Sequence, residues 1–143
     1  MGLKILFTNA QSIVNKINKE RAIVTTLEPD VIAFTETWTN ETIDNSHLQI
    51  KGYEILVRED RSDTEKGRGG GILVYGRDEL QMWQEEIGTV FSQCGTTIIK
   101  IGNNEIRLHT VYRSPNSANE NDEQLCEWVR EMRDEGEHAF DGV

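Results

Sequence analysis

The feature that most constrains the fold is a strand, a helix and a second strand that follow one another in residues 3–36. LKILFTN (3–9) is a short apolar run with a polar end, which is typical of a buried strand. From Ser12 onward, apolar residues recur at helical spacing with charged residues between them, which indicates an amphipathic helix packed on a sheet. DVIAFTE (30–36) is apolar without alternation, as in a strand covered on both faces. The sequence therefore predicts a βαβ unit, whose two strands run parallel when they share a sheet.

The remainder of the chain predicts further strands and one more helix. Pro29 disfavours the helical conformation at the residue before it, so the first helix is expected to end at Glu28. Residues 121–133 carry apolar side chains at helical spacing and predict a second helix, and GNN (102–104) predicts a hairpin turn. The expected strands are GYEILVRED (52–60), GRGGGILVYG (67–76), TTIIKI (96–101) and EIRLHTVYR (105–113). No repeat or linker interrupts this pattern, so one structural unit is expected.

Composition narrows the possible functions. The chain has 143 residues, the length of one ordinary domain, and a formal net charge of −10. This charge argues against binding nucleic acid through a broad basic surface, but it allows an enzyme that approaches phosphate through a bound cation, because such a site needs acidic ligands. No segment is apolar enough to span a bilayer and no signal peptide is recognised, so a soluble intracellular protein, nuclear or cytoplasmic, is expected. Cys94 and Cys126 are too few and too far apart for a zinc framework and are interpreted as reduced and structural.

Polar residues follow both strands of the βαβ unit. Asn9 ends the first strand and Glu36 ends the second. Because parallel strands place their carboxyl ends at one edge of a sheet, a carboxamide and a carboxylate are expected to meet there. Magnesium favours one or two carboxylates together with waters and substrate phosphate, so this edge is a plausible start to a magnesium site. The residues alone leave a second interpretation open, in which Asn9 satisfies a turn and Glu36 is an exposed strand end.

Four segments taken together resemble a known family. They are TNAQSI (8–13), PDVIAFTETW (29–38), RGGGILVY (68–75) and VYRSPNS (111–117). In this order and spacing they resemble the endonuclease/exonuclease/phosphatase superfamily, and most closely the endonuclease domains at the N-terminus of non-LTR (LINE-type) retrotransposon polyproteins. The resemblance implies an α/β (α+β) fold, an incomplete four-layer α/β/β/α sandwich with two sheets face to face. Residues 1–133 are interpreted as the N-terminal portion of such a domain, and residues 134–143 as a non-matching acidic tail.

The resemblance also implies roles for individual residues. Asn9 matches the asparagine that lies beside the metal and orients its neighbours, and Glu36 matches the glutamate that ligates a divalent cation, usually Mg²⁺, with Mn²⁺ as a substitute. Tyr112 matches the strand-end tyrosine whose hydroxyl contacts the scissile phosphate. Arg113 follows where members of the family vary, and is assigned a further phosphate contact. The implied activity is hydrolysis of DNA phosphodiesters, with DNA as the partner of the complete domain.

The chain departs from the family near its end. The later motifs GDFN and SDH, which activate the attacking water, are absent, and DEGEHAFDGV (134–143) holds no apolar run able to form another strand. His138 and Asp141 match neither motif, while His109 and His47 are interpreted as structural. The chain is therefore expected to be an inactive fragment that self-associates through an exposed inner sheet face. The alternatives are another phosphoesterase of the superfamily (phosphatase, phospholipase or deadenylase) and a non-catalytic acidic interaction module.

The remaining candidate features favour structural interpretations. GRGGG (67–71) matches no complete phosphate-binding motif, and its glycines are interpreted as permitting a turn or a close backbone approach. Trp38 is interpreted as an ordinary core aromatic residue. Four basic residues gather near the preceding loop, but acidic residues alternate with them, so a solvated loop is expected there; these residues are Arg58, Arg61, Lys66 and Arg68.

Overall fold

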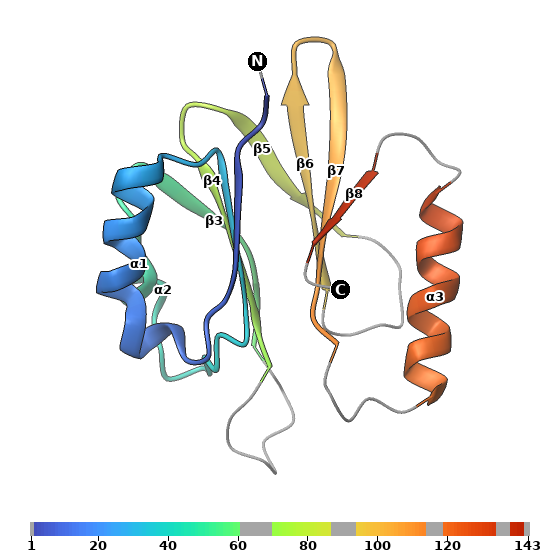
Figure 1. The fold of residues 1–143 in the computed structure, drawn as a ribbon, viewed down its shortest axis with the longest axis horizontal. Coiled ribbons are helices and arrows are strands. Elements are labelled where there is room, and N and C mark those ends of the chain that lie inside the picture. Colours follow the sequence, from blue (N-terminus) through green and yellow to red (C-terminus); the bar gives the residue numbers. More distant parts are fainter. Residues whose placement is uncertain (1, 61–69, 87–93, 114–118, 134–137, 142–143) are drawn as a thin grey trace.

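The computed structural model describes residues 2–60, 70–86, 94–113, 119–133 and 138–141 (Figure 1). Eleven helices and strands follow one another in these residues. They are β1 (Ile5–Asn9), α1 (Ile13–Leu27), β2 (Val31–Thr35), α2 (Asn45–Leu48), β3 (Tyr53–Glu59), β4 (Ile72–Arg77), β5 (Gln81–Glu85), β6 (Cys94–Ile101), β7 (Asn104–Val111), α3 (Asn119–Arg133) and β8 (His138–Asp141). None of the described helices is long and apolar enough to cross a membrane.

The strands form two four-stranded sheets. The first has the order β1-β2-β4-β3 and the second has the order β5-β6-β7-β8. β1 and β2 are parallel, as the βαβ pattern predicts, and their register pairs Asn9 with Thr35, so the two strands end level. β6 and β7 form the predicted hairpin, and Gly102 in its turn has a φ of 59°. α1 ends at Leu27 because Glu28, which precedes Pro29, turns into the left-handed region and donates its backbone N–H to the carbonyl of Val24 at 2.8 Å.

Three apolar clusters separate four layers of secondary structure. α1 and α2 cover the outer face of the first sheet, the second sheet faces its inner side, and α3 covers the far face of the second sheet (Figure 1). All five residues of β2 are buried because alternate side chains enter two different clusters, Ile32 and Phe34 on the helix side and Val31 and Ala33 between the sheets. The four-layer α/β/β/α arrangement is the fold that the resemblance implies.

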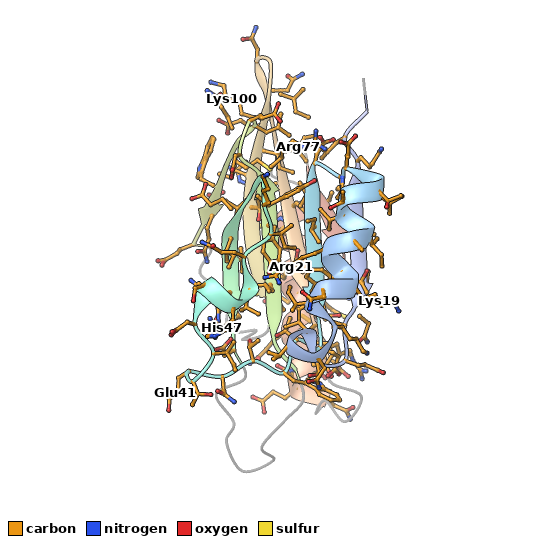
Figure 2. The ribbon with its side chains drawn as sticks, turned by 90° about the vertical axis from the view of Figure 1, so that its left-hand side faces the viewer. Lys19, Arg21, Glu41, His47, Arg77 and Lys100 are labelled. Atoms are coloured by element: carbon orange, nitrogen blue, oxygen red, sulfur yellow. The ribbon has the colours of Figure 1, made fainter. Side chains whose placement is uncertain are left out.

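Arg21 joins the two helices on the outer side of the first sheet. Its side chain extends from α1 toward the segment that follows α2 (Figure 2). Its guanidinium donates to the carbonyl of Gln49 at 2.7 Å and to that of His47 at 3.3 Å. Each of these carbonyls lies at or beyond the end of a four-residue helix, where backbone oxygens have no partner within the helix, so Arg21 stabilises the connection between α2 and β3.

Two strands are not predicted from the sequence. β5 pairs with β6 although most of its residues are exposed, because backbone hydrogen bonds to a neighbour can form an edge strand without an apolar pattern. The last ten residues were expected to contain no strand, and this expectation is wrong. β8 pairs in parallel with β7, from His138 opposite Arg107 to Asp141 opposite Thr110.

The edge of the first sheet leaves part of its inner face uncovered. Ile5 and Phe7 pair with Val31 and Ala33, which lie in the cluster between the sheets, so the four side chains share one face. Ile5 is nevertheless 37% exposed and Phe7 is 41% exposed, and both lie on β1, an edge strand of the first sheet. The exposed inner face expected from the sequence is therefore present on β1, whereas β2 and β4 are covered.

Candidate functional site

The candidate site lies where β1, β2 and β7 end. The carboxyl ends of these strands lie at the lower end of the molecule in Figure 1. The parallel pairing of β1 and β2 continues into the loops beyond them. The backbone N–H of Ala10 donates to Thr35 at 2.8 Å, that of Ser12 to Glu36 at 3.0 Å, and that of Ile13 to Thr37 at 3.0 Å. These bonds fix the backbone of residues 35–37 against the start of α1.

Glu36 is held by donors from three parts of the chain. Its Oε2 atom accepts a hydrogen bond from the indole Nε1–H of Trp38 at 2.6 Å and one from the backbone N–H of Gly70 at 3.1 Å. Its Oε1 atom accepts a hydrogen bond from the hydroxyl of Tyr112. Tyr112 follows β7 of the second sheet, whereas Glu36 follows β2 of the first. The half-buried carboxylate therefore sits where the two sheets meet, with a fixed orientation.

The backbone around Glu36 adopts an uncommon conformation. Glu36 and Trp38 have φ values of 54° and 56°, and Gln11 and Ser12 in the adjacent loop have φ values of 46° and 78°. Each left-handed residue other than glycine costs about 1–3 kcal/mol, and such residues concentrate at functional sites. Four of the five that occur among the described residues lie in these two loops. This concentration makes the edge at Glu36 the leading candidate for a functional site.

Two glycines allow the start of β4 to approach this edge. Gly70 and Gly71 have φ values of 71° and 100°. Gly70 donates its N–H to Glu36 and accepts the backbone N–H of Trp38 at 3.0 Å. A Cβ atom on Gly71 would collide with Oγ1 of Thr37. The close backbone approach predicted for the glycine run is therefore confirmed at these two positions.

A polar network supports the loop after Glu36. Thr37 and Thr39 are buried with their hydroxyls 3.4 Å apart, and the hydroxyl of Thr39 donates to Asp60 at 2.6 Å. Arg58 donates to both carboxylate oxygens of Asp60, at 3.0 and 3.1 Å, and to the side chain of Asn45 at 2.7 Å. The solvated role expected for Arg58 is wrong, because this residue lies in β3 and ties α2 to the site. The other basic residues of that expectation, Arg61, Lys66 and Arg68, lie outside the described residues.

The structure brings three of the four sequence-predicted residues to one region. Asn9 is exposed at the end of β1, beside the strand that leads to Glu36, and Tyr112 contacts Glu36 directly. Arg113 instead forms a two-point ion pair with Asp122 of α3, with distances of 2.8 and 2.9 Å. This hydrogen-bonded carboxylate raises the pKa of the Arg113 guanidinium. Asp122 was not considered from the sequence, where only its place in the first turn of a helix is visible.

Trp38 is the functional candidate that sequence reasoning missed. The sequence predicts an ordinary core aromatic at this position, but the side chain is only half-buried and its indole N–H donates to the Glu36 carboxylate. A helical or strand periodicity carries no information on this contact, because it depends on two left-handed residues. The spacing of two residues between a carboxylate and a tryptophan was the only available signal.

The histidines and cysteines lie apart from this arrangement. His109 is buried, lies 2.8 Å through Nδ1 from Oγ1 of Thr96, and packs edge-on against Trp128 with ring centres 5.0 Å apart, so its predicted structural role is confirmed. His47 is exposed on α2. The side chains of His138 and Asp141 lie outside the described residues. Cys126 is exposed on α3, and burial, with the charge of Glu59, raises the pKa of the Cys94 thiol to about 11.

The residues of the site fit part of a divalent-cation site. Among the described residues, no three histidine, cysteine or acidic side chains gather in a way that could hold a metal ion. Mg²⁺ needs fewer protein ligands than that, since it commonly keeps several waters and is bound through one or two carboxylates with substrate phosphate. Glu36 supplies one fixed carboxylate, and Asn9 supplies a carboxamide on the same edge.

Comparison with solved structures identifies related folds. No protein-family model matches the sequence, and no curated protein matches it. The endonuclease domain of TRAS1, a telomere-specific non-LTR retrotransposon, matches with a TM-score of 0.64 and 16% identity over 99% of this chain and 58% of that one. AP endonuclease LMAP from Leishmania major matches with a TM-score of 0.63 and 18% identity, over 92% of this chain and 46% of that one. The 3'-5' exonuclease NExo from Neisseria meningitidis matches with a TM-score of 0.66 and 17% identity, over 96% of this chain and 56% of that one.

These matches establish the fold. The chain spans about half the length of these three structures, from 46% to 58% of each. All three are nucleases, and together with the two sheets and the order of their strands they confirm the endonuclease/exonuclease/phosphatase fold that the resemblance implies.

Proposed function

We propose that this chain, which has the endonuclease/exonuclease/phosphatase fold, is the N-terminal part of a retrotransposon-type DNA endonuclease domain that hydrolyses phosphodiesters with a divalent cation. The observation that carries the proposal is the Glu36 carboxylate. It stands at the carboxyl end of a parallel strand pair and is oriented by Trp38, by Gly70 and, from the facing sheet, by Tyr112. Four segments of retrotransposon-endonuclease type surround this residue in the sequence, and the TRAS1 endonuclease domain covers 99% of the chain in the structural comparison.

Each residue of the site has a defined task in this proposal. Glu36 is the protein ligand of the cation, with Asn9 beside it to orient the ligand shell. We propose Mg²⁺ as the native cation, with Mn²⁺ able to replace it. A bound divalent cation stabilises the charge that develops on the phosphate. It also offsets the repulsion between a DNA backbone and a chain with a net charge of −10.

Tyr112 and Arg113 are the proposed phosphate contacts. The hydroxyl of Tyr112 donates to Glu36 in the structure, and a hydroxyl rotates readily, so its proton can turn to a phosphate oxygen. Arg113 contacts phosphate only after it leaves the carboxylate of Asp122. The water-activating residues of the family have no counterpart in the sequence, which lacks both GDFN and SDH, and we propose that the 143-residue chain does not cleave DNA alone.

The cation site is tested by equilibrium binding. Mn²⁺ binding to the purified chain is followed by electron paramagnetic resonance, with Mg²⁺ as a competitor, for the unmodified chain and for Glu36→Ala. Glu105→Ala is the matched control, because it removes one exposed carboxylate from the start of β7. The proposal requires binding that competes with Mg²⁺, is lost in Glu36→Ala and is retained in Glu105→Ala. Equal binding by all three chains would instead favour a non-catalytic acidic module.

The catalytic part of the proposal is tested by nicking of supercoiled plasmid DNA. The chain is incubated with Mg²⁺ or with a chelator, beside Glu36→Ala. The expected result is no nicking above the background of the variant. Nicking that depends on Mg²⁺ and is lost in Glu36→Ala would show that the chain contains its own water-activating group. Release of inorganic phosphate from a 3'-phosphorylated oligonucleotide, without nicking, would favour the phosphatase alternative.

A further inference from the structure

We propose that Trp38 determines which divalent cation the site accepts, because its indole N–H restricts Glu36 to ligation through one carboxylate oxygen. The inference rests on the proposed cation site at Glu36 and deepens it. The relevant distinction is between Mg²⁺ and the larger Ca²⁺. The sequence suggests a core position for Trp38, and a residue in the core would not influence which cation binds.

The Oε2 atom of Glu36 is occupied by two donors that cannot rotate away. The indole N–H of Trp38 lies in a rigid ring at 2.6 Å, and the N–H of Gly70 belongs to the backbone at 3.1 Å. The backbone of Trp38 is held in place, since its N–H donates to the carbonyl of Gly70 at 3.0 Å. Trp38 and Gly70 therefore form a closed pair that binds both the carboxylate and each other. A carboxylate oxygen offers about two lone-pair positions, and both of those on Oε2 are directed at N–H groups.

The Oε1 atom has a partner of a different kind. It accepts a hydrogen bond from the hydroxyl of Tyr112, which can rotate its proton to another acceptor while the oxygen stays in place. A cation that approaches Glu36 displaces a rotatable hydroxyl proton at Oε1, but it would have to break a fixed N–H bond at Oε2. The arrangement thus favours one-oxygen ligation at Oε1, on the side of the facing sheet.

The number of carboxylate oxygens offered discriminates between cations. Ca²⁺ takes six to eight oxygen ligands and frequently binds a carboxylate through both oxygens, whereas Mg²⁺ requires an octahedral shell, keeps several waters and binds carboxylates through one oxygen. A glutamate that can ligate through only one oxygen therefore lowers the affinity of the site for Ca²⁺ more than its affinity for Mg²⁺. Removal of the indole N–H opens one position on Oε2 and improves the site for Ca²⁺.

The test compares the affinities for Ca²⁺ and Mg²⁺ in three chains. Trp38→Phe removes the N–H and keeps an aromatic ring, and replacement of Trp38 by 3-(3-benzothienyl)alanine exchanges only the N–H for sulfur and keeps the shape. Trp83→Phe is the matched control, because Trp83 is exposed on the edge strand β5. Both affinities are measured by competition with Mn²⁺ observed by electron paramagnetic resonance. Thermal unfolding of each variant checks that it is folded.

The ratio of Ca²⁺ to Mg²⁺ affinity is expected to rise on the order of tenfold in both Trp38 variants and to stay unchanged in Trp83→Phe. A loss of packing alone would lower both affinities together, so an unchanged ratio in the benzothienyl variant overturns the inference, whatever Trp38→Phe does. The two proposals fail differently. If the Glu36→Ala variant binds Mn²⁺ as tightly as the unmodified chain does, the cation site itself is refuted. If binding depends on Glu36 but the ratio does not depend on Trp38, only the selectivity inference is refuted.

Discussion

The hydroxyl of Tyr112 donates a hydrogen bond to the carboxylate of Glu36, which lies 76 residues earlier in the chain and at the end of a strand in the other sheet. The two sheets otherwise meet through apolar side chains such as Val57, Ile99 and Leu108. This bond therefore adds a polar, charge-assisted contact at the edge of an apolar interface. It makes the orientation of the proposed metal ligand depend on how the two sheets pack.

Tyr112→Phe is expected to lower the free energy of unfolding by about 1.5–3 kcal/mol, the range for a hydrogen bond to a charged group. Tyr75→Phe is the control, because the hydroxyl of Tyr75 donates to the neutral carbonyl of Leu48 and its loss is expected to cost about 0.5–1.5 kcal/mol. Urea denaturation measures both. Equal losses would show that the charge of Glu36 contributes nothing to the contact with Tyr112.

Gly71→Ala is expected to destabilise the fold more than Gly52→Ala. Both glycines have positive φ values, 100° and 87°, so each substitution carries a backbone strain of about 1–3 kcal/mol. Only the Cβ at residue 71 also meets a neighbour, the hydroxyl of Thr37, while the space beside Gly52 is open. Thermal unfolding compares the two variants. The excess loss should shrink when Thr37→Ala is added to Gly71→Ala, and its persistence would contradict the collision.

Asp122→Asn is expected to raise the affinity for DNA in the presence of Mg²⁺, because it releases Arg113 from an exposed ion pair. The slope of log affinity against log salt concentration should steepen by about one, as for one additional phosphate contact. Fluorescence anisotropy of a labelled duplex measures both quantities. The double variant Asp122→Asn with Arg113→Gln should lose the gain, and a gain that survives in it would assign the effect to another residue.

Alkylation is expected to separate the two cysteines. The raised pKa of Cys94, about 11, keeps this thiol protonated at pH 8, whereas Cys126 is exposed on α3. Because the thiolate is the reactive form, iodoacetamide at pH 8 should modify Cys126 first and Cys94 slowly, and the rate at Cys94 should increase as the pH approaches 11. Mass spectrometry locates the label, and in the Cys126→Ser variant the rate of alkylation at Cys94 is measured alone. In denaturant both thiols should react at similar rates; a persistent difference there would exclude burial as the cause.

Phe7→Lys is expected to reduce self-association of the chain. Phe7 is 41% exposed on the inner face of β1, where it adjoins the apolar cluster between the sheets. Val14 has the same exposed fraction but lies on α1, so Val14→Lys is a control of equal exposure and equal charge change. Sedimentation velocity at several concentrations measures the associated fraction. If both substitutions act alike, association depends on net charge and not on the edge of the sheet.

The βαβ unit and the edge at which the candidate site lies can be predicted from residues 3–36 alone. Periodicity reports which faces of a helix or strand are buried, so the span of α1 and the two-sided burial of β2 are visible in it. Asn9 and Glu36 then lie at the same edge of the sheet because parallel strands point the same way. Tyr112 could be placed at the site only through the resemblance, since nothing local in residues 104–113 connects this tyrosine to a glutamate in the other sheet.

The contacts that these residues make cannot be predicted from the sequence in the same way. β5 and β8 exist because neighbouring strands supply hydrogen bonds to their backbones, which leaves little trace in their own side chains. The contact between Trp38 and Glu36 depends on two left-handed backbone conformations, and those are held by the loops after β1 and before β4. The pairing of Arg113 with Asp122 depends on where α3 packs. The pairings of β5 and β8 and the contact of Arg113 with Asp122 join segments whose separation in space is set by the packing of the sheets and helices, and local sequence patterns carry no information on that separation.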